Sequence, residues 1–216
     1  MPTDKTKVKR APKRGHYDSE TIYKILDADF ICQVGFVFNG YPVVIPTIYG
    51  RKDDWIYFHG ASVSRMLVAM EKGVPISINV TQTDGIVLAR SAFHHSLNYH
   101  SVTVFGQAEV VTDSNERLEA LKVVSDQIIP GRWEEARLPN AKELKATKVL
   151  KLQLTEASAK IRTGPPKDEK EDYHLDIWAG VIPIEKKYGQ PIADPELKVG
   201  IEVPNSVKNM NFKNKN

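Results

Sequence analysis

Short apolar runs separated by tight turns dominate the middle of the chain, between residues 30 and 111. Most of these runs are rich in β-branched and aromatic residues, which is typical of strands. Residues 31–38 and 41–49 flank the dipeptide Asn39-Gly40, the strongest short-range signal for a β-hairpin. The pattern therefore predicts two paired strands at the start of a sheet-rich region.

Pro42 and Pro46 lack the amide hydrogen that an inner strand needs, so residues 41–49 are expected at the edge of a sheet. A turn at Thr83-Asp84 is expected to join two of the later strands. Further strands are expected at residues 55–59, 74–81, 85–91, 99–111 and 149–161. Apolar residues recur at helical spacing after Ser64, after Asp113 and within residues 133–146, which predicts three helical stretches.

These elements predict a mainly β fold with flanking helices, in the form of a split antiparallel β-barrel. Strands and helices alternate too rarely for a doubly wound parallel sheet, and no Gly-x-Gly-x-x-Gly follows a strand. We place the folded domain at residues 15–184. Residues 1–14 are expected to form a disordered basic tail, and residues 185–216 an extended or disordered one.

Composition narrows the class of protein. With 216 residues, 41% of them hydrophobic and 26% charged, the chain is expected to be globular and soluble, without a membrane span. Cys32 is the single cysteine, so no intrachain disulfide can form, which fits a reducing cytoplasm. The net charge of +3 is concentrated at the two ends, without interleaved aromatic residues, so we expect no nucleic-acid partner.

One segment combines groups that suit a phosphate. After an apolar strand, Gly60 and Ala61 lead to Ser62, Ser64 and Arg65 at the expected start of a helix. Hydroxyl groups and unpaired backbone amides can donate to an oxyanion, and an arginine can pair with it bidentately. From chemistry alone, an ordinary serine-capped helix with a surface arginine explains these residues slightly better, because serine caps are common and Arg65 has no fixed partner in the sequence.

Four segments in order resemble the flavin-binding split barrels of the pyridoxamine-5′-phosphate-oxidase-like family, and most closely its nitroimidazole-resistance (Nim-type) branch. They are Tyr-Pro-Val-Val-Ile-Pro-Thr at residues 41–47, Tyr-Phe-His-Gly-Ala at 57–61 with Ser64-Arg65, the strand at 99–108 and Trp-Ala-Gly-Val-Ile-Pro at 178–183. Each segment is a weak signal alone, but the four together cover roughly residues 15–184 in the family's order.

The resemblance implies flavin mononucleotide (FMN), with FAD as an option, bound at the interface of a homodimer. By similarity, Ser64 and Arg65 bind the phosphate together with the turn at Gly60, Ala61 and Ser62. The same resemblance places Val44, Ile45, Pro46 and Thr47 along the ring and ribityl chain, Ser101 near the phosphate or ribityl end, and Trp178 over the pocket. A core tryptophan in a docked C-terminal segment is the alternative for Trp178. Met66 stands where the oxidases commonly have a lysine, which argues against oxidation of pyridoxamine phosphate.

Histidines leave further alternatives open. By resemblance, His59 lies beside the flavin and could donate a proton, although a histidine that packs at a strand end fits equally well. His94, His95 and His100 suggest haem or a metal, but adjacent residues of a strand point to opposite faces, and no cysteine or carboxylate pair completes a metal site. We therefore expect no metal ion.

The resulting hypothesis is an FMN-dependent oxidoreductase, in which a reduced nicotinamide or similar donor reduces the flavin and a small molecule accepts the electrons. His59 is its tentative catalytic residue. Two alternatives remain, a non-catalytic flavin-binding or storage protein and a haem-binding split-barrel relative.

Overall fold

Two antiparallel sheets form the framework of the computed structural model, which describes residues 2–210. The larger sheet has the strand order β1-β10-β7-β6-β2-β3, with β11 paired to β6, and the smaller has the order β4-β5-β9-β8. The strands are β1 (Gly15–His16), β2 (Ile31–Phe38), β3 (Tyr41–Ile48), β4 (Gly50–Lys52), β5 (Trp55–Ala61), β6 (Ile76–Leu88), β7 (Ser96–Gly106), β8 (Glu109–Val110), β9 (Thr147–Gln153), β10 (Glu156–Arg162) and β11 (Gly180–Pro183). This architecture confirms the mainly β, split-barrel prediction.

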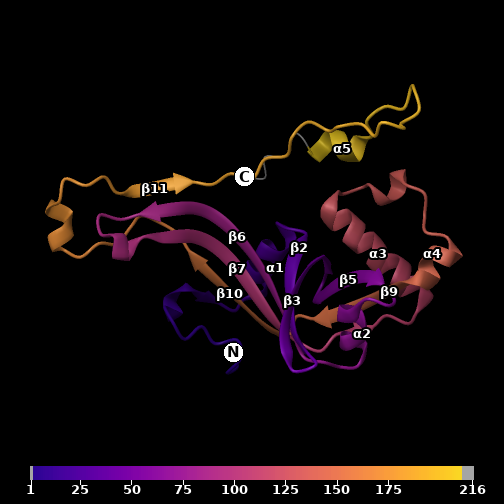
Figure 1. Cartoon of the computed structure of the whole chain (residues 1–216), viewed down its shortest axis with the longest axis horizontal. Coiled ribbons are helices and arrows are strands. Elements are labelled where there is room, and N and C mark those ends of the chain that lie inside the picture. Colours follow the sequence, from indigo (N-terminus) through magenta and orange to yellow (C-terminus); the bar gives the residue numbers. More distant parts are fainter. Residues whose placement is uncertain (1, 211–216) are drawn as a thin grey trace.

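The helices are α1 (Ser19–Asp27), α2 (Arg65–Glu71), α3 (Ser114–Ile128), α4 (Ala141–Ala146) and α5 (Asn205–Met210). Helices α2, α3 and α4 lie around the end of the molecule that holds β5 and β9 (Figure 1). Asp113 accepts a hydrogen bond from the amide of Glu116 and so caps α3, as its sequence predicts. Helix α1 was not predicted, although Ile22, Ile25 and Leu26 bury one of its faces. Within the described residues, no helix is long and apolar enough to span a membrane.

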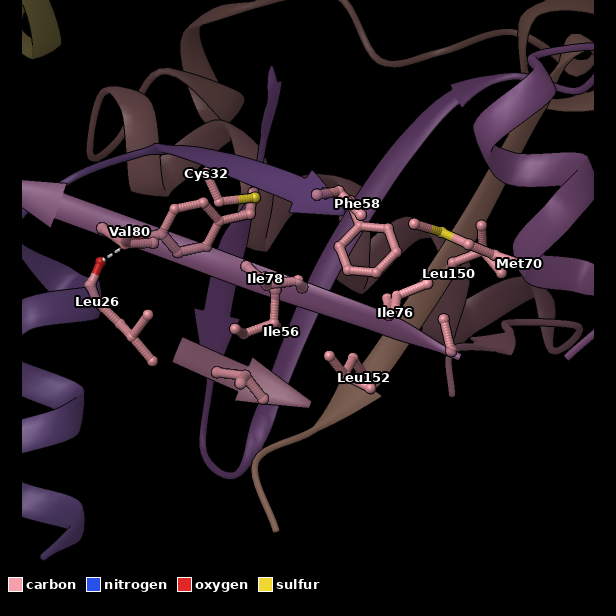
Figure 2. Packing of buried hydrophobic residues seen from close by; sticks show 14 of the residues in the cluster. Leu26, Cys32, Ile56, Phe58, Met70, Ile76, Ile78, Val80, Leu150 and Leu152 are labelled. Atoms are coloured by element: carbon pink, nitrogen blue, oxygen red, sulfur yellow. Dashed lines mark hydrogen bonds between the residues drawn. The ribbon is translucent and has the colours of Figure 1, made fainter. Parts of the chain in front are cut away.

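The core lies between the two sheets (Figure 2). Alternate residues of β2 and β5 point into it, so that Val34 and Phe58 are fully buried. Ile78 of β6 and Leu150 of β9 meet them in one continuous cluster. Cys32 is also fully buried there, as expected for a small apolar residue of this strand.

The hairpin prediction is confirmed. β2 and β3 pair with each other and are joined by a turn at Asn39 and Gly40. Both turn residues have positive φ angles, 50° and 81°, as a tight hairpin turn requires. β3 closes the order of the larger sheet, so its two prolines sit on an edge strand, as expected.

Three predicted strand assignments are wrong. Most residues of the two strands expected at 74–81 and 85–91 form the single strand β6, and a register shift between Thr83 and Gly85 replaces the expected turn. A β-bulge inserts one residue without ending the strand, which explains the error. Conversely, the strand expected at 99–111 is divided between β7 in the larger sheet and β8 in the smaller sheet. Residues 149–161 also form two strands rather than one: β9 pairs with β5 in the smaller sheet, and β10 pairs with β7 in the larger sheet.

The paired strands β6 and β7 extend beyond the barrel as a long arm, with β11 alongside (Figure 1). The segment before the barrel is not detached, in contrast to the expected tail. The hydroxyl of Thr3 donates to Glu156 at 2.5 Å, and Thr6 is buried. Most residues between 185 and 204 are exposed and have no regular structure, before α5 begins. The last part of the expected C-terminal tail, residues 211–216, lies outside the described residues.

Candidate functional site

Side chains along β3 point alternately to the two faces of the sheet, so the residues expected to lie along the flavin are split between those faces. Val44 and Pro46 lie opposite Gly35 and Gln33 of β2, on the side of the sheet that faces away from the core. Val44 is 67% exposed there. Ile45, by contrast, packs against the core, and Thr47 lies opposite the buried Cys32. The structure therefore brings only Val44 and Pro46 of this group onto one open surface.

This open surface continues across β6 and β7, and we call it the outer face. It carries a ladder of polar side chains, in which Thr81 donates to Asn79 at 2.7 Å and Asn79 donates to Thr103 at 3.1 Å. Ser101 lies opposite Thr81 and donates to the carbonyl of Lys160 at 3.3 Å. Ser101 thus shares a sheet face with Val44. The sequence analysis missed Asn79, Thr81 and Thr103, although their spacing of two residues within predicted strands was a usable signal.

The expected phosphate-binding turn joins β5 to α2. The amide of Ser62 donates to the carbonyl of Ala146 at 2.9 Å, and the amide of Ser64 donates to Ala61 at 2.8 Å. Ser64 is the first residue before α2, yet its hydroxyl makes no capping hydrogen bond to a described residue. That hydroxyl therefore remains available to bind a ligand, whereas the hydroxyl of a capping serine would already be occupied by a backbone amide.

Arg65 is exposed and lies beside the hairpin of β2 and β3. Its guanidinium group is 5.4 Å from the centre of the Phe38 ring, so the arginine stacks near the tip of that hairpin. A Cβ added at Gly60 would meet Leu67 of α2 at 3.1 Å, so this glycine allows a close approach of strand and helix. The turn thus holds two hydroxyls and a guanidinium group at one open corner of the barrel.

His59 faces the opposite side of the smaller sheet. Its neighbour Phe58 fills the core between the sheets, so the alternation of β5 turns His59 towards α3 and α4. There it opens into a cavity of about 380 Å³ that we call the His59 hollow. The hollow is lined by His59, Leu121, Val124, Ser125, Ile128, Trp133, Arg137, Pro139, Glu143, Leu144 and Thr147.

The environment of His59 favours a neutral imidazole. The surrounding atoms of the His59 hollow desolvate the ring, which lowers its pKa below the ordinary value of 6.5. His59 itself is nevertheless exposed at the mouth of the hollow, so this desolvation is partial. At the rim, Arg137 pairs with Glu143, with a shortest contact of 2.6 Å.

The other candidate histidines have protein partners on the arm. His95 accepts a hydrogen bond from the amide of Ala89 at 3.0 Å, and His100 lies 2.6 Å from the carboxylate of Asp84. His94 ends the short 3₁₀ helix η2 (Ala92–His94), so the argument that the two adjacent histidines point to opposite faces of a strand does not apply to His94 and His95. Within the described part of the chain, no group of three or more His, Cys, Asp or Glu residues could hold a metal ion.

Trp178 lies just before β11 and is 65% exposed. Its ring covers Gly180, where an added Cβ would meet it at 3.0 Å. β11 runs along the arm, whereas α2 lies at the other end of the barrel (Figure 1). Within one chain, the structure therefore does not bring Trp178 to the corner formed by Ser62, Ser64 and Arg65.

Comparison with known proteins resolves the family. Residues 18–161 match the family model described as pyridoxamine 5′-phosphate oxidase. The chain belongs to this family. The fold is therefore that of the flavin-binding, pyridoxamine-phosphate-oxidase-like proteins, which confirms the resemblance. None of the proteins with curated descriptions matches the sequence significantly.

Two solved structures of this type match almost the whole chain. The flavocytochrome Anf3 from Azotobacter vinelandii is 42% identical, with 97% of each chain covered and a TM-score of 0.92. The FAD- and haem-binding protein from Mycobacterium smegmatis is 36% identical, with 91% of this chain and 97% of that chain covered and a TM-score of 0.88. A candidate 5-nitroimidazole resistance protein from Bacteroides thetaiotaomicron shares the fold at 19% identity, with 68% and 86% covered and a TM-score of 0.56.

Proposed function

We propose that this member of the pyridoxamine-phosphate-oxidase-like family is a redox protein that binds both a flavin and haem. One observation carries the proposal: the relatives that are 42% and 36% identical span 97% and 91% of the chain. One of them is described as a flavocytochrome and the other as an FAD- and haem-binding protein. The similarity extends past residue 161, where the family model ends, and so takes in β11 and most of the C-terminal segment.

For the flavin phosphate we propose the corner formed by Ser62, Ser64 and Arg65. The uncommitted hydroxyl of Ser64 and the exposed guanidinium group of Arg65 are suitable donors to an anionic ester. This corner is open, since Val63 is 84% exposed, so an adenylate could extend from the phosphate into solvent. We therefore propose FAD as the flavin, with FMN as the alternative, and the mass of the released cofactor decides between them.

For the ring we propose the outer face, beside Val44 and Pro46, with Ser101 on the same face. When bound, a flavin supplies one- and two-electron transfer and haem supplies one-electron transfer. The residues of this chain anchor and orient these groups. We propose further that a reduced donor such as a nicotinamide reduces the flavin and that a small molecule accepts the electrons. The alternative is a flavin carrier without catalytic activity.

We further propose a homodimer, with Trp178 contributed by the partner subunit to the flavin site. The arm and the outer face carry many exposed apolar side chains that a monomer would leave in water. They include Ile31, Val37, Val44, Ile48, Ile86, Leu175, Ile177, Trp178 and Ile182. The cytoplasm remains the expected compartment, which the single buried thiol of Cys32 supports.

The test is to express the chain, supply FAD and hemin, and record the absorbance spectrum after removal of unbound cofactor. We expect flavin bands together with a Soret band, and mass spectrometry should identify both cofactors after denaturation. Light scattering should give twice the chain mass of 24.3 kDa. A protein that retains neither cofactor would overturn the proposal. Flavin retention with no bleaching by NADH or NADPH would favour the non-catalytic carrier.

A further inference from the structure

We propose that residues 184–203, which we call the strap, pack across the partner subunit of a homodimer and hold the two chains together. This inference rests on the homodimer of the proposed function and goes beyond it, because it names the segment that secures the dimer. The strap lies outside residues 18–161, which match the family model, so it is an addition to the barrel that the family shares.

The strap is exposed along its whole length. Every residue from 184 to 203 is exposed, and none of them lies in a helix or a strand. Seven of these twenty residues are nevertheless large and apolar, and the side chains of Ile192 and Val199 are almost completely exposed to solvent. Single apolar residues on a surface are common, but a succession of them along one segment marks a site of interaction.

The composition of the strap is not that of a segment that remains in water. Flexible linkers and disordered segments are rich in glycine, serine and charged residues and poor in large aliphatic and aromatic ones. In the strap, about one residue in three is large and apolar. The composition therefore indicates that a second surface covers the strap.

Both ends of the strap are attached to their own chain. At its start, the amide of Ile184 donates to the carbonyl of Asp84 at 3.0 Å. Just beyond its end, the buried Ser206 hydrogen-bonds through its amide and its hydroxyl to the carboxylate of Glu135. The strap therefore runs between two anchored elements, β11 and α5 (Figure 1). A segment that is anchored at both ends and exposed between them can lie across a partner without losing its own attachment.

A second copy of this chain is the partner that the surface fits best. The strap continues directly from β11, where Trp178 and Ile182 are exposed on the surface already proposed for the dimer. In a two-fold dimer the same surface of each chain meets its partner, so one contact covers both straps. With twenty residues, the strap alone approaches the 20–30 residues that one side of a standard interface contains.

The first test measures whether the strap is covered, and by which chain. Val199→Cys is loaded with FAD and labelled with a maleimide, and Leu138→Cys, at an exposed position before α4, is the matched control. The native Cys32 is buried and should give little background. At concentrations that favour the dimer, we expect Val199→Cys to react more than about tenfold more slowly than the control, and to match it once dilution separates the chains. Equal rates in the dimer would overturn the proposal. Protection that persists in separated monomers would overturn it too, since the strap would then fold onto its own chain.

The second test weakens the contact without disturbing the barrel. Ile192→Asp combined with Val199→Asp changes two side chains that the single chain leaves in water, so circular dichroism should match that of the wild type. At a dimer interface the same two carboxylates would be desolvated without a partner, and we expect the dimer Kd to rise more than about tenfold. Leu138→Asp adds a carboxylate at an exposed apolar position outside the strap, and its Kd should equal that of the wild type.

Sedimentation equilibrium of the FAD-loaded full chain measures these constants. Mixing with a tagged wild-type chain, followed by native mass spectrometry, measures subunit exchange, which should be faster in the double variant. If the wild type forms a dimer and the double variant has the same Kd and exchange rate, the role of the strap is wrong while the homodimer stands. If the wild type is a monomer at every concentration, the homodimer of the proposed function fails as well.

Discussion

Gly50 of β4 lies directly against the main chain of Val123 in α3. A Cβ at residue 50 would come within 2.6 Å of the Val123 carbonyl oxygen and 2.7 Å of the Cα of Val124. These are backbone atoms, so no side-chain rotation can make room. The contact fixes the distance between the smaller sheet and α3, and therefore the position of one wall of the His59 hollow.

Gly50→Ala is accordingly expected to push α3 away from the sheet and to lower the free energy of unfolding by about 1–3 kcal/mol. Chemical denaturation monitored by tryptophan fluorescence measures this change. Gly189→Ala is the matched control, because a Cβ there meets nothing within 4 Å. Equal midpoints for the two variants would show that α3 and β4 are less tightly coupled than their geometry indicates.

Cys32 is expected to be unreactive in the folded protein. Burial raises the pKa of its thiol to about 12, so the nucleophilic thiolate is scarce at neutral pH, and the side chain has no exposed surface. Ellman's reagent should therefore label the thiol only as the protein unfolds, with a time course that follows the loss of circular dichroism. Rapid labelling of native protein would show that β2 opens locally.

Tyr49 and Gln127 converge on one carbonyl. The buried hydroxyl of Tyr49 donates to Leu26 at 2.5 Å, and the amide of Gln127 donates to the same oxygen at 3.0 Å. Tyr49→Phe should cost only about 0.5–1.5 kcal/mol of stability, because Gln127 still satisfies the carbonyl. The double variant, Tyr49→Phe with Gln127→Leu, should lose more stability than the sum of the losses in the two single variants, as a double-mutant cycle would measure.

Arg65 provides a test of the flavin corner. Arg65→Ala should raise the flavin Kd about tenfold or more, since a charge-assisted hydrogen bond contributes roughly 1.5–3 kcal/mol. Lys72→Ala removes an exposed positive charge from the other end of α2 and serves as the control for general electrostatic attraction. Fluorescence quenching of added FAD and FMN measures both variants. Equal affinities in Arg65→Ala and the wild type would remove the phosphate assignment.

The sequence predicted the elements whose signals are local. Asn39-Gly40 encodes the hairpin through its backbone freedom, and Asp113 encodes the start of α3 through its side-chain oxygen. The features that the sequence did not predict depend on pairing with strands far away in the sequence. The bulge between Thr83 and Gly85 resembles a turn until β7 is seen to pair across it, and β9 and β10 separate only because they join different sheets.

The same distinction between local signals and distant partners applies to the candidate site. Its residue types came from four short segments, and Arg65 does lie near the β2–β3 hairpin, beside Phe38. Which face each side chain occupies follows from the pleat of its strand, and this separates Val44 from Ile45. The His59 hollow has no signal in the sequence, because α3 and α4, more than 50 residues further along the chain, close it around His59.

The lowered pKa of His59 predicts a specific pH dependence of stability in the cofactor-free protein. Above pH 6.5 the ring is neutral in both the folded and the unfolded chain, so it contributes nothing to the pH slope. Below pH 6.5 the unfolded chain takes up a proton that the desolvated ring in the folded chain resists. The unfolded state then binds more protons, and the free energy of unfolding falls as the pH is lowered, until the pH reaches the folded-state pKa.

His59→Gln cannot titrate and should lack this loss. The difference in unfolding free energy between wild type and His59→Gln, measured in urea, should therefore stay constant above pH 6.5 and shift below it in favour of the variant. A difference that remains constant through both ranges would show that the His59 ring is as well hydrated in the folded chain as in open water.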